Sequence, residues 1–236
     1  MITELEWDSA FFGMKVGKLT GITHSVEIEE RALEVARSAG FKLLYATVEH
    51  PLEATTLNRL DRFGVFLADQ KASFICSDLT EITRECASQI SSLLGPSDPA
   101  MESLAILAGE FSRFRLDPRI PKGKFEELYR LWIRKSISRE FADEVIVVRI
   151  DGDLAGLLTM SQKETVGNLG LIAVDPKFRG RGVGSDLVQG FMKWSAERGC
   201  LSCMIPTQLA NEPACRLYTR AGFKLHSVES LLHFWL

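Results

Sequence analysis

The sequence has little of what marks the specialised classes of protein. Cysteine is scarce, at 5 of 236 residues, which is too few for a disulfide framework and indicates reduced thiols in a cytoplasmic protein. Hydrophobic runs stay well below the roughly 18 residues that suggest a membrane span. The start of the chain lacks the basic and apolar stretches of a signal peptide. We therefore expect a cytoplasmic protein without a membrane partner.

An excess of positive charge is also missing. The formal net charge is −3, which does not favour non-specific nucleic-acid binding, so no nucleic-acid partner is expected. Acidic side chains outnumber basic ones before residue 95 but not after it. The second part of the chain is therefore the better place to look for an anionic ligand.

Clusters of metal ligands are equally scarce. Cys200 and Cys203 are three positions apart, and residues at that spacing on a strand face opposite sides, so they do not easily share a metal ion. A zinc site would need further ligands as well. No metal is expected.

The sequence does contain an ordinary globular mixture of helix and strand patterns, divided by one strong break. It is 46% hydrophobic and 25% charged, and the segment from Gly95 to Pro99 is its strongest cluster of helix- and strand-breaking residues. We expect an N-terminal α/β domain over residues 1–95 and a second domain over residues 100–236.

Hydrophobic periodicity predicts the elements of both parts. Before the break we expect helices over 26–39 and 53–63, and strands over 14–19, 42–48 and, as one or two strands, 65–76. After it we expect helices over 101–111, 125–139, 185–197 and 211–221, strands over 145–150, 154–161, 169–174 and 201–205, and a closing pair of strands over 223–236. This order predicts an α/β (α+β) fold in which a mixed, twisted sheet is flanked by helices.

The most informative segment is a glycine-rich loop between a hydrophobic strand and a helix. The strand contains Leu171, Ile172, Ala173 and Val174, and the loop contains Arg179, Gly180, Arg181, Gly182, Val183 and Gly184. Glycines let a backbone approach a ligand closely, and N–H groups at a helix N-terminus point towards negative oxygens. The spacing fits neither a P-loop nor a dinucleotide fingerprint. The residues alone therefore indicate an anion site, with a tight strand-to-helix turn as an equally good alternative.

A second motif lies near the end of the chain. Asn211 is a good helix N-cap and Gly222 a good helix stop. Tyr218 follows Asn211 by close to two helical turns, so the two share one helix face. The alternative for Tyr218 is a core tyrosine whose hydroxyl is satisfied.

Together the two motifs resemble those of the GNAT N-acetyltransferases. Arg179, Gly182 and Gly184 occupy the family's Gln/Arg-x-x-Gly-x-Gly/Ala positions, and residues 211–223 match Asn-x-x-Ala-x-x-x-Tyr-x-x-x-Gly-Phe. The resemblance implies a GNAT fold over residues 100–236 and acetyl-CoA as cofactor. The loop amides would hold its pyrophosphate, and the backbone of the strand would pair with its pantetheine arm. Asn211 would contact that arm, and Tyr218 would protonate the departing thiolate as general acid.

A looser resemblance covers most of the chain and concerns the acceptor. The opening Leu5–Gly13, and Arg113 and Arg115 ahead of the helix with Tyr129, are similar to the dTDP-fucosamine acetyltransferases. This implies direct acetyl transfer, in a ternary complex, to the amine of a nucleotide-linked amino sugar, with residues 1–95 contributing to the acceptor site. Arg113 and Arg115 are candidates for the phosphates, with a solvated helix end or an ion pair with Asp117 as the alternative.

Several alternatives stay open at this stage. Glu49, at the end of a predicted strand, is a further substrate-binding candidate, and no general base is identified. The acceptor could instead be a protein N-terminus, a polyamine or an antibiotic, and a non-catalytic acyl-CoA sensor is a third interpretation. A homodimer is an open alternative for the assembly.

Overall fold

The computed structural model describes residues 1–20, 30–52, 54, 58, 60–79, 90–93 and 95–236. In chain order its elements are β1 (Ile2–Glu4), α1 (Glu6–Phe12), β2 (Val16–Leu19), α2 (Glu30–Ser38), β3 (Leu43–Glu49), η1 (Asp61–Phe63), β4 (Val65–Cys76), β5 (Ile90–Ser92), α4 (Pro99–Ala108), α5 (Arg113–Leu116), α6 (Lys124–Ile137), β6 (Glu144–Ile150), β7 (Asp153–Lys163), β8 (Val166–Val174), η2 (Pro176–Phe178), α7 (Val183–Glu197), β9 (Ser202–Gln208), α8 (Glu212–Arg220) and β10 (Lys224–Trp235). None of these helices is long and apolar enough to cross a membrane.

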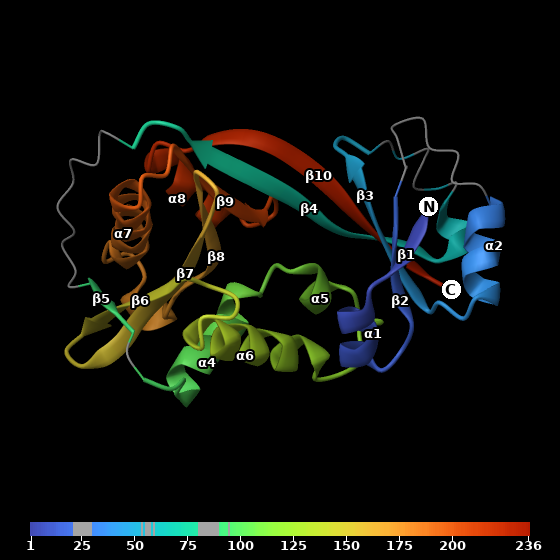
Figure 1. Ribbon diagram of the computed structural model, residues 1–236, viewed down its shortest axis with the longest axis horizontal. Helices are drawn as coiled ribbons and strands as arrows, with labels where there is room; N and C mark the ends of the chain where they lie inside the picture. Colours follow the sequence, from blue (N-terminus) through green and yellow to red (C-terminus); the bar gives the residue numbers. More distant parts are fainter. Residues whose placement is uncertain (21–29, 53, 55–57, 59, 80–89, 94) are drawn as a thin grey trace.

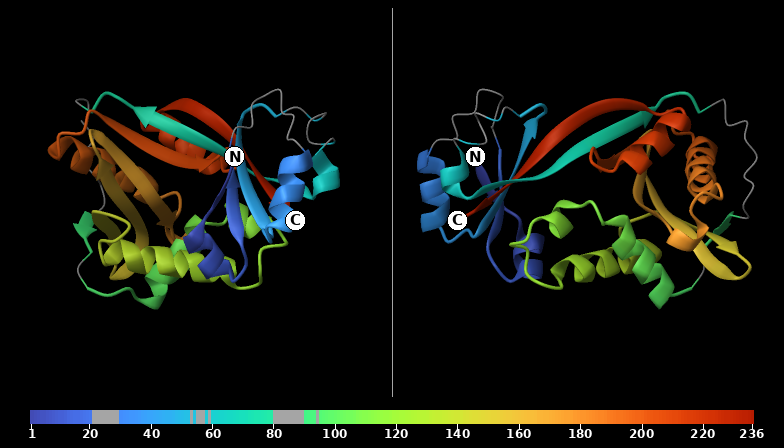
Figure 2. Two further views of the ribbon diagram at one scale, coloured as in Figure 1. Left: turned by 45° about the vertical axis from the view of Figure 1, so that its right-hand side comes forward. Right: turned by 180° about the vertical axis from the view of Figure 1, so that it is seen from behind.

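All the strands of the described residues join one mixed sheet. It has 10 strands in the order β1-β2-β3-β10-β4-β9-β8-β7-β6-β5, with parallel pairing at β2–β3 and β8–β9. The long strands β4 and β10 run side by side from the half with α7 and α8 to the half with β1, β2, β3 and α2 (Figure 1). In the view from behind (Figure 2, right), β4 and β10 lie above α4, α5 and α6. The predicted mixed sheet with flanking helices is confirmed.

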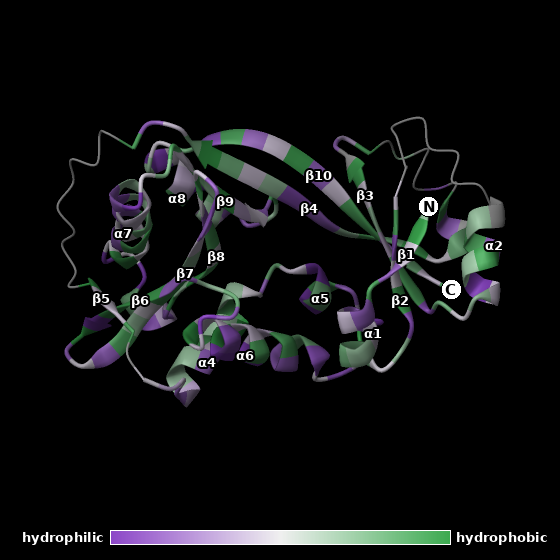
Figure 3. Cartoon of the chain, viewed as in Figure 1, coloured by the Kyte–Doolittle hydropathy of each residue, from purple (hydrophilic) through white to green (hydrophobic). Residues whose placement is uncertain are grey.

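Alternation of apolar residues decides which helix covers which face. On β6, Ile146 and Val148 belong to the cluster that contains residues of α7 and α8, whereas Val145 and Val147 belong to the cluster of α4 and α6. Both faces of this part of the sheet are therefore covered. Bands of hydrophobic and hydrophilic residues along β4 and β10 are visible in Figure 3.

The connection across the predicted domain boundary is a strand pairing. β4 precedes the Gly95–Pro99 break, yet it pairs with β9 from Lys71 to Cys76 and with β10 along most of its length. Asp98 caps α4 by accepting a hydrogen bond from the Met101 N–H, with Pro99 in the first turn. The division into domains over 1–95 and 100–236 stays a prediction, but the strand between β9 and β10 comes from the N-terminal part.

One predicted element is wrong, and some of the observed elements were not predicted. The closing pair of strands is a single strand, β10, of 12 residues, because Lys224–Trp235 contains no glycine or proline that would reverse the chain. β1, α1 and β5 were not predicted; β1 and β5 have only 3 residues each, too few to show a period. The predicted helices over 26–39 and 53–63 lie partly outside the described residues; their described ends are α2 and the 3-10 turn η1.

Candidate functional site

β8 and β9 separate soon after they begin, and the opening between them is the core of the site. Their parallel register covers only Val166–Asn168 against Ser202–Met204. Further along, β8 stays paired with β7 and β9 stays paired with β4. The facing edges of residues 169–174 and 205–208 therefore diverge. Backbone groups on such edges can pair with an extended ligand that enters between the strands.

A β-bulge marks the point where β8 turns away. Leu158 pairs with Ile172 but Met160 pairs with Leu169, so two residues of β8, Gly170 and Leu171, face Thr159 alone. The Leu171 N–H donates a hydrogen bond of 2.8 Å to Thr159 Oγ1. A Cβ on Gly170 would lie 2.6 Å from the same oxygen, so the close packing of the bulge requires glycine at this position.

The glycine-rich loop lies at the carboxyl end of β8. Gly180 and Gly182 have φ values of 76° and 87°, in the left-handed region that favours glycine, and Gly182 is the N-cap of α7. The first N–H groups of a helix have no partner within the helix and carry partial positive charge. Residues 182–185 line the opening, so α7 presents this end to it.

A single cavity of about 1270 Å³ joins the loop, the diverging strands and the strand β4. Most of the residues proposed from the two motifs line it, and so does one arginine of the acceptor proposal: Leu171, Ile172, Ala173, Val174, Arg179, Gly180, Gly182, Val183, Gly184, Asn211, Tyr218 and Arg113. Arg181 and Arg115 are not among its lining residues. The backbone of Glu49 ends β3, and its side chain lies outside the described part of the structure.

Helix α8 holds the two residues of the second motif. The Asn211 side chain accepts a hydrogen bond of 3.3 Å from the Ala214 N–H, which confirms the predicted N-cap. Tyr218 is only 2% exposed and packs edge-on against Phe74 of β4, with ring centroids 5.8 Å apart. Burial, together with the nearby Cys215, raises the pKa of Tyr218. The phenol therefore stays protonated at neutral pH, as a proton donor must.

At the other end of the cavity, Arg113 lies among aromatic rings and carboxylates. Its guanidinium carbon is 4.0 Å from the ring centroid of Tyr45 and 4.5 Å from that of Phe114. Burial lowers the pKa of Arg113, and the charges of Tyr45, Asp8 and Asp69 oppose this. The cluster of Arg113, Asp8 and Asp69 brings together α5, α1 and β4.

Arg115 has a different environment from Arg113. Its side chain is 56% exposed, and its Nη1 lies 3.8 Å from Glu126 Oε1. The expected alternative, an ion pair with Asp117, is made instead by Arg119, at 3.2 Å. The structure thus brings one of the two candidate arginines into the cavity and leaves the other outside its lining.

Sequence reasoning missed several residues of the cavity. Asp69 of β4 and Gln208 of β9 line it, as do Tyr129 and Trp132 of α6, whose rings stack at 5.7 Å and 27°. Asp69 has no motif around it. The one available signal was a carboxylate in the middle of a predicted strand, because an Asp is rarely buried there unless it has a partner or a function.

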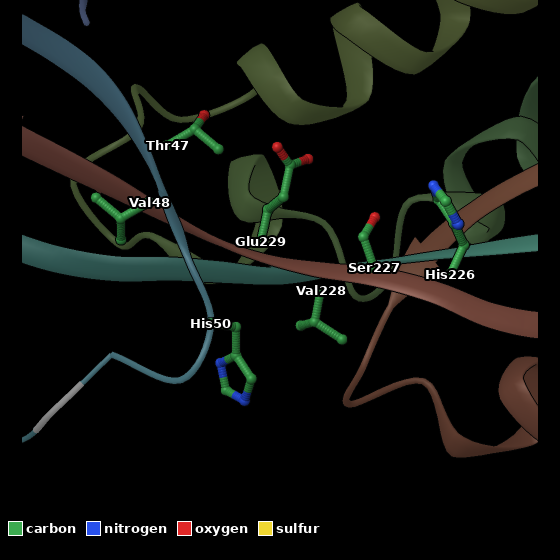
Figure 4. A pocket seen from close by; sticks show the side chains of 7 residues that line it. All are labelled: Thr47, Val48, His50, His226, Ser227, Val228 and Glu229. Atoms are coloured by element: carbon green, nitrogen blue, oxygen red, sulfur yellow. The ribbon is translucent and has the colours of Figure 1, made fainter. Parts of the chain in front are cut away.

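A smaller hollow of about 370 Å³ lies where β3 and β10 meet. Its side chains do not converge: His50, Val48 and Val228 point to one side of the strands, and Thr47 and Glu229 to the other (Figure 4). We therefore assign no chemistry to it.

Comparison with curated proteins finds two relatives that are named for sugar or polysaccharide chemistry. The chain is 30% identical over 142 residues to the dTDP-fucosamine acetyltransferase of Escherichia coli, a match that covers 58% of each protein. It is 28% identical over 146 residues to the spore coat polysaccharide biosynthesis protein SpsD of Bacillus subtilis, covering 60% of this chain and 50% of that one. The chain thus spans between 50% and 58% of the length of these curated relatives.

Solved structures and family models agree with these relatives. The GCN5-related N-acetyltransferase from Kribbella flavida matches with a TM-score of 0.58 at 14% identity, covering 93% of this chain and 81% of that one. Likeness at this level of identity shows the fold. The model of the acetyltransferase (GNAT) family matches residues 109–223, which include both motifs. The resemblance inferred from the two motifs is thereby confirmed: residues 109–223 of this chain match the acetyltransferase (GNAT) family.

Proposed function

We propose that the chain is an acetyl-CoA-dependent N-acetyltransferase whose acceptor is the amine of a nucleotide-linked amino sugar. The observation that carries this is the continuity of one cavity from the glycine loop, past Tyr218, to the polar cluster around Arg113. A protein that only bound acyl-CoA would need the first part of this cavity but neither a protonated phenol nor a polar chamber beyond it.

The cofactor end has the groups that acetyl-CoA requires. The N-terminus of α7 and Arg179 supply N–H donors and positive charge for the pyrophosphate. The diverging edge of β8 supplies backbone groups for the amides of the pantetheine arm. Gly184 allows a close approach between α7 and α8, since a Cβ there would lie 3.2 Å from Leu217 Cδ2.

Direct transfer fits this geometry. The amine nitrogen attacks the thioester carbonyl carbon, the carbon–sulfur bond breaks, and Tyr218 donates its phenolic proton to the leaving thiolate. The tyrosine recovers a proton from the nitrogen, which loses one as the amide forms. An N–H of β8 between Ile172 and Val174 would hold the carbonyl oxygen, because the Leu171 N–H is already bonded to Thr159.

Support for the acceptor comes from the relatives and from the far end of the cavity. One relative is named as a dTDP-fucosamine acetyltransferase and another as a spore coat polysaccharide protein. The stacked rings of Tyr129 and Trp132 form an aromatic surface on which a base or sugar face can pack. Arg113 and Arg115 are the candidates for the phosphates from the sequence; Arg115 is the more accessible, whereas the charge of Arg113 is already offset by Asp8 and Asp69. Cytoplasmic location and a homodimeric assembly also stay predictions.

A thiol-release assay tests the proposal. The purified chain is mixed with acetyl-CoA and, separately, with dTDP-4-amino-4,6-dideoxy sugars, UDP-amino sugars, spermidine and a peptide with a free N-terminus. We expect coenzyme A release with the dTDP amino sugars. Release with spermidine or the peptide alone would overturn the sugar acceptor and keep the acetyltransferase. Binding of acetyl-CoA by calorimetry without release in any mixture would overturn both and favour a sensor.

A further inference from the structure

Asp69 is a cavity carboxylate that neither motif of the sequence accounts for. It lies on β4, the strand that the N-terminal part of the chain inserts between β9 and β10. We propose that Asp69 is the general base of the site, whose carboxylate takes a proton from the ammonium of the acceptor. This inference rests on the proposed transfer to an amine and adds the residue that prepares the amine for attack.

The backbone of β4 directs this side chain into the cavity. Leu231 of β10 pairs with Asp69, but the next residue, Leu232, pairs with Leu67, so Ala68 is an extra residue in a β-bulge. Bulges re-aim neighbouring side chains and are frequent beside active sites. Ala68 is only 2% exposed, whereas Asp69 and Lys71 line the cavity from one face of the strand.

The elements packed around Asp69 set its charge state. Arg113 faces it from α5, Tyr129 from α6 and the Gln208 amide from β9, while Lys71 lies on its own strand. Burial raises the pKa of Asp69 to about 6, and the positive charges and hydrogen bonds of these neighbours only partly offset it. A carboxylate that titrates near the working pH is a more effective base than one of ordinary pKa.

The charge of the surrounding cluster favours a cation at this place. The charge of Arg113 interacts with that of Asp69 and with that of Asp8. Lys71 also interacts with Asp69, but its Nζ is 3.4 Å from Glu229 Oε2, so with all three carboxylates ionised the two positive charges face three negative ones. An ammonium group is the ligand that balances the remaining negative charge, since opposite charges attract strongly away from bulk water.

The proton balance is complete without another reactant. The acceptor ammonium gives one proton to Asp69, which passes it to solvent after transfer. The neutral nitrogen then forms the bond to the carbonyl carbon, and its second proton replaces the one that Tyr218 gives to the thiolate. The products are the amide, coenzyme A as its thiol and one released proton.

The decisive experiment is the pH profile of Asp69→Asn with the amine that the thiol-release assay identifies. In the wild-type enzyme we expect kcat/KM to fall as pH drops through about 6. In the variant we expect kcat/KM to be lower by about 10² to 10⁴ at neutral pH, with that acid limb lost. Acetyl-CoA affinity should be unchanged, and Asp69→Glu should recover part of the rate. Asp153→Asn, at the exposed start of β7, is the matched control.

Three results would overturn the assignment, two of them kinetic. Wild-type kcat/KM in Asp69→Asn excludes a base there, and a reduced rate that keeps the acid limb reduces Asp69 to a positioning residue. A melting comparison needs no acceptor, so it separates failure of this inference from failure of the proposed function. The raised pKa means that stability from the protonated carboxyl is lost as pH rises through about 6. The melting temperature of Asp69→Asn should therefore exceed that of the wild type by a margin that grows over this rise in pH. A margin that does not change with pH would contradict the inference.

Discussion

The two ends of the cavity are built in different ways. At the cofactor end, β8, the glycine loop, α7 and α8 come from one continuous stretch, residues 166–220, and each contact is made close to the next along the chain. At the acceptor end, Asp8, Asp69, Arg113 and Tyr129 come from α1, β4, α5 and α6. The first end is built mostly from that one stretch, although Tyr218 also packs against Phe74 of β4. The second exists only when β4 is inserted between β9 and β10, because Asp69 lies on that strand.

The largest expected effect lies at the boundary between the two ends. Tyr218→Phe removes the proton donor, so kcat should fall by about 10²-fold or more while the dissociation constant of acetyl-CoA stays the same. Steady-state kinetics and calorimetry measure the two quantities. An unchanged kcat in Tyr218→Phe would make Tyr218 a core residue only.

A further large effect is expected at the buried carboxylate of Asp117, which follows α5 and is not among the residues that line the cavity. Asp117 is buried, and its carboxylate lies 2.8 Å from His233 Nδ1 and accepts a hydrogen bond of 2.8 Å from Trp235 Nε1. Burial alone would raise the pKa of Asp117, but hydrogen bonds from His233, Trp235 and Arg119 lower it overall. We expect Asp117→Asn to reduce the free energy of unfolding by about 2 kcal/mol at neutral pH.

The pH dependence of that loss gives a second check. Because the folded-state pKa of Asp117 is lowered, the stability it contributes is present above its unfolded pKa, near 4, and is lost as pH falls below that. The difference between wild type and Asp117→Asn in urea unfolding should therefore shrink in acid. A difference that stays constant from neutral pH to about pH 3 would show that the charge of Asp117 does not stabilise its contacts with His233 and Trp235.

A moderate effect is expected from strain in the cofactor loop. Gly182 has φ of 87° and no atom within 4 Å of a Cβ position, so Gly182→Ala adds backbone strain without a clash. The strained loop should relax away from this conformation in the free protein, and restoring it on binding at a cost of about 1 kcal/mol should weaken acetyl-CoA binding by roughly fivefold. Gly40→Ala is a matched control, with φ of 82° and equally open space after α2, far along the chain from the loop. It should lower stability but leave acetyl-CoA binding unchanged. Equal affinities for the wild type and Gly182→Ala would show that the loop conformation does not limit binding.

The smallest effect concerns Arg115. Its ion pair with Glu126 is exposed, so Arg115→Ala should change the free energy of unfolding by less than about 0.5 kcal/mol. If the side chain reaches the phosphates of a sugar nucleotide, KM for that acceptor should rise by about threefold with kcat unchanged. An unchanged KM would leave Arg113 as the only arginine of the pair at the acceptor end.

The residues explain why prediction succeeded for some elements and failed for others. Helices α6 and α7 were predicted because their apolar residues recur at helical spacing, and β6, β7 and β8 because they contain short apolar runs, two of which flank an Asp-Gly turn. β10 was wrongly predicted as two strands, although Lys224–Trp235 contains no glycine or proline to reverse the chain. Its first half pairs with β4 alone and its second half pairs with β3 as well. Arg113 could be named from its sequence neighbours, whereas Asp69 could not, because a carboxylate in a strand carries no motif.

What the sequence alone determined is the cofactor end of the site. A strand, a glycine loop and a capped helix are decided by neighbours a few residues apart, and local backbone preferences are enough to specify them. Only the tertiary structure decided the acceptor end. The Asp117–His233 contact spans 116 residues, and Asp69 meets Arg113 only after β4 has joined β9 and β10. The burial that shifts the pKa of Asp69 exists only after those long-range contacts form, so the chemistry of the acceptor end belongs to the fold.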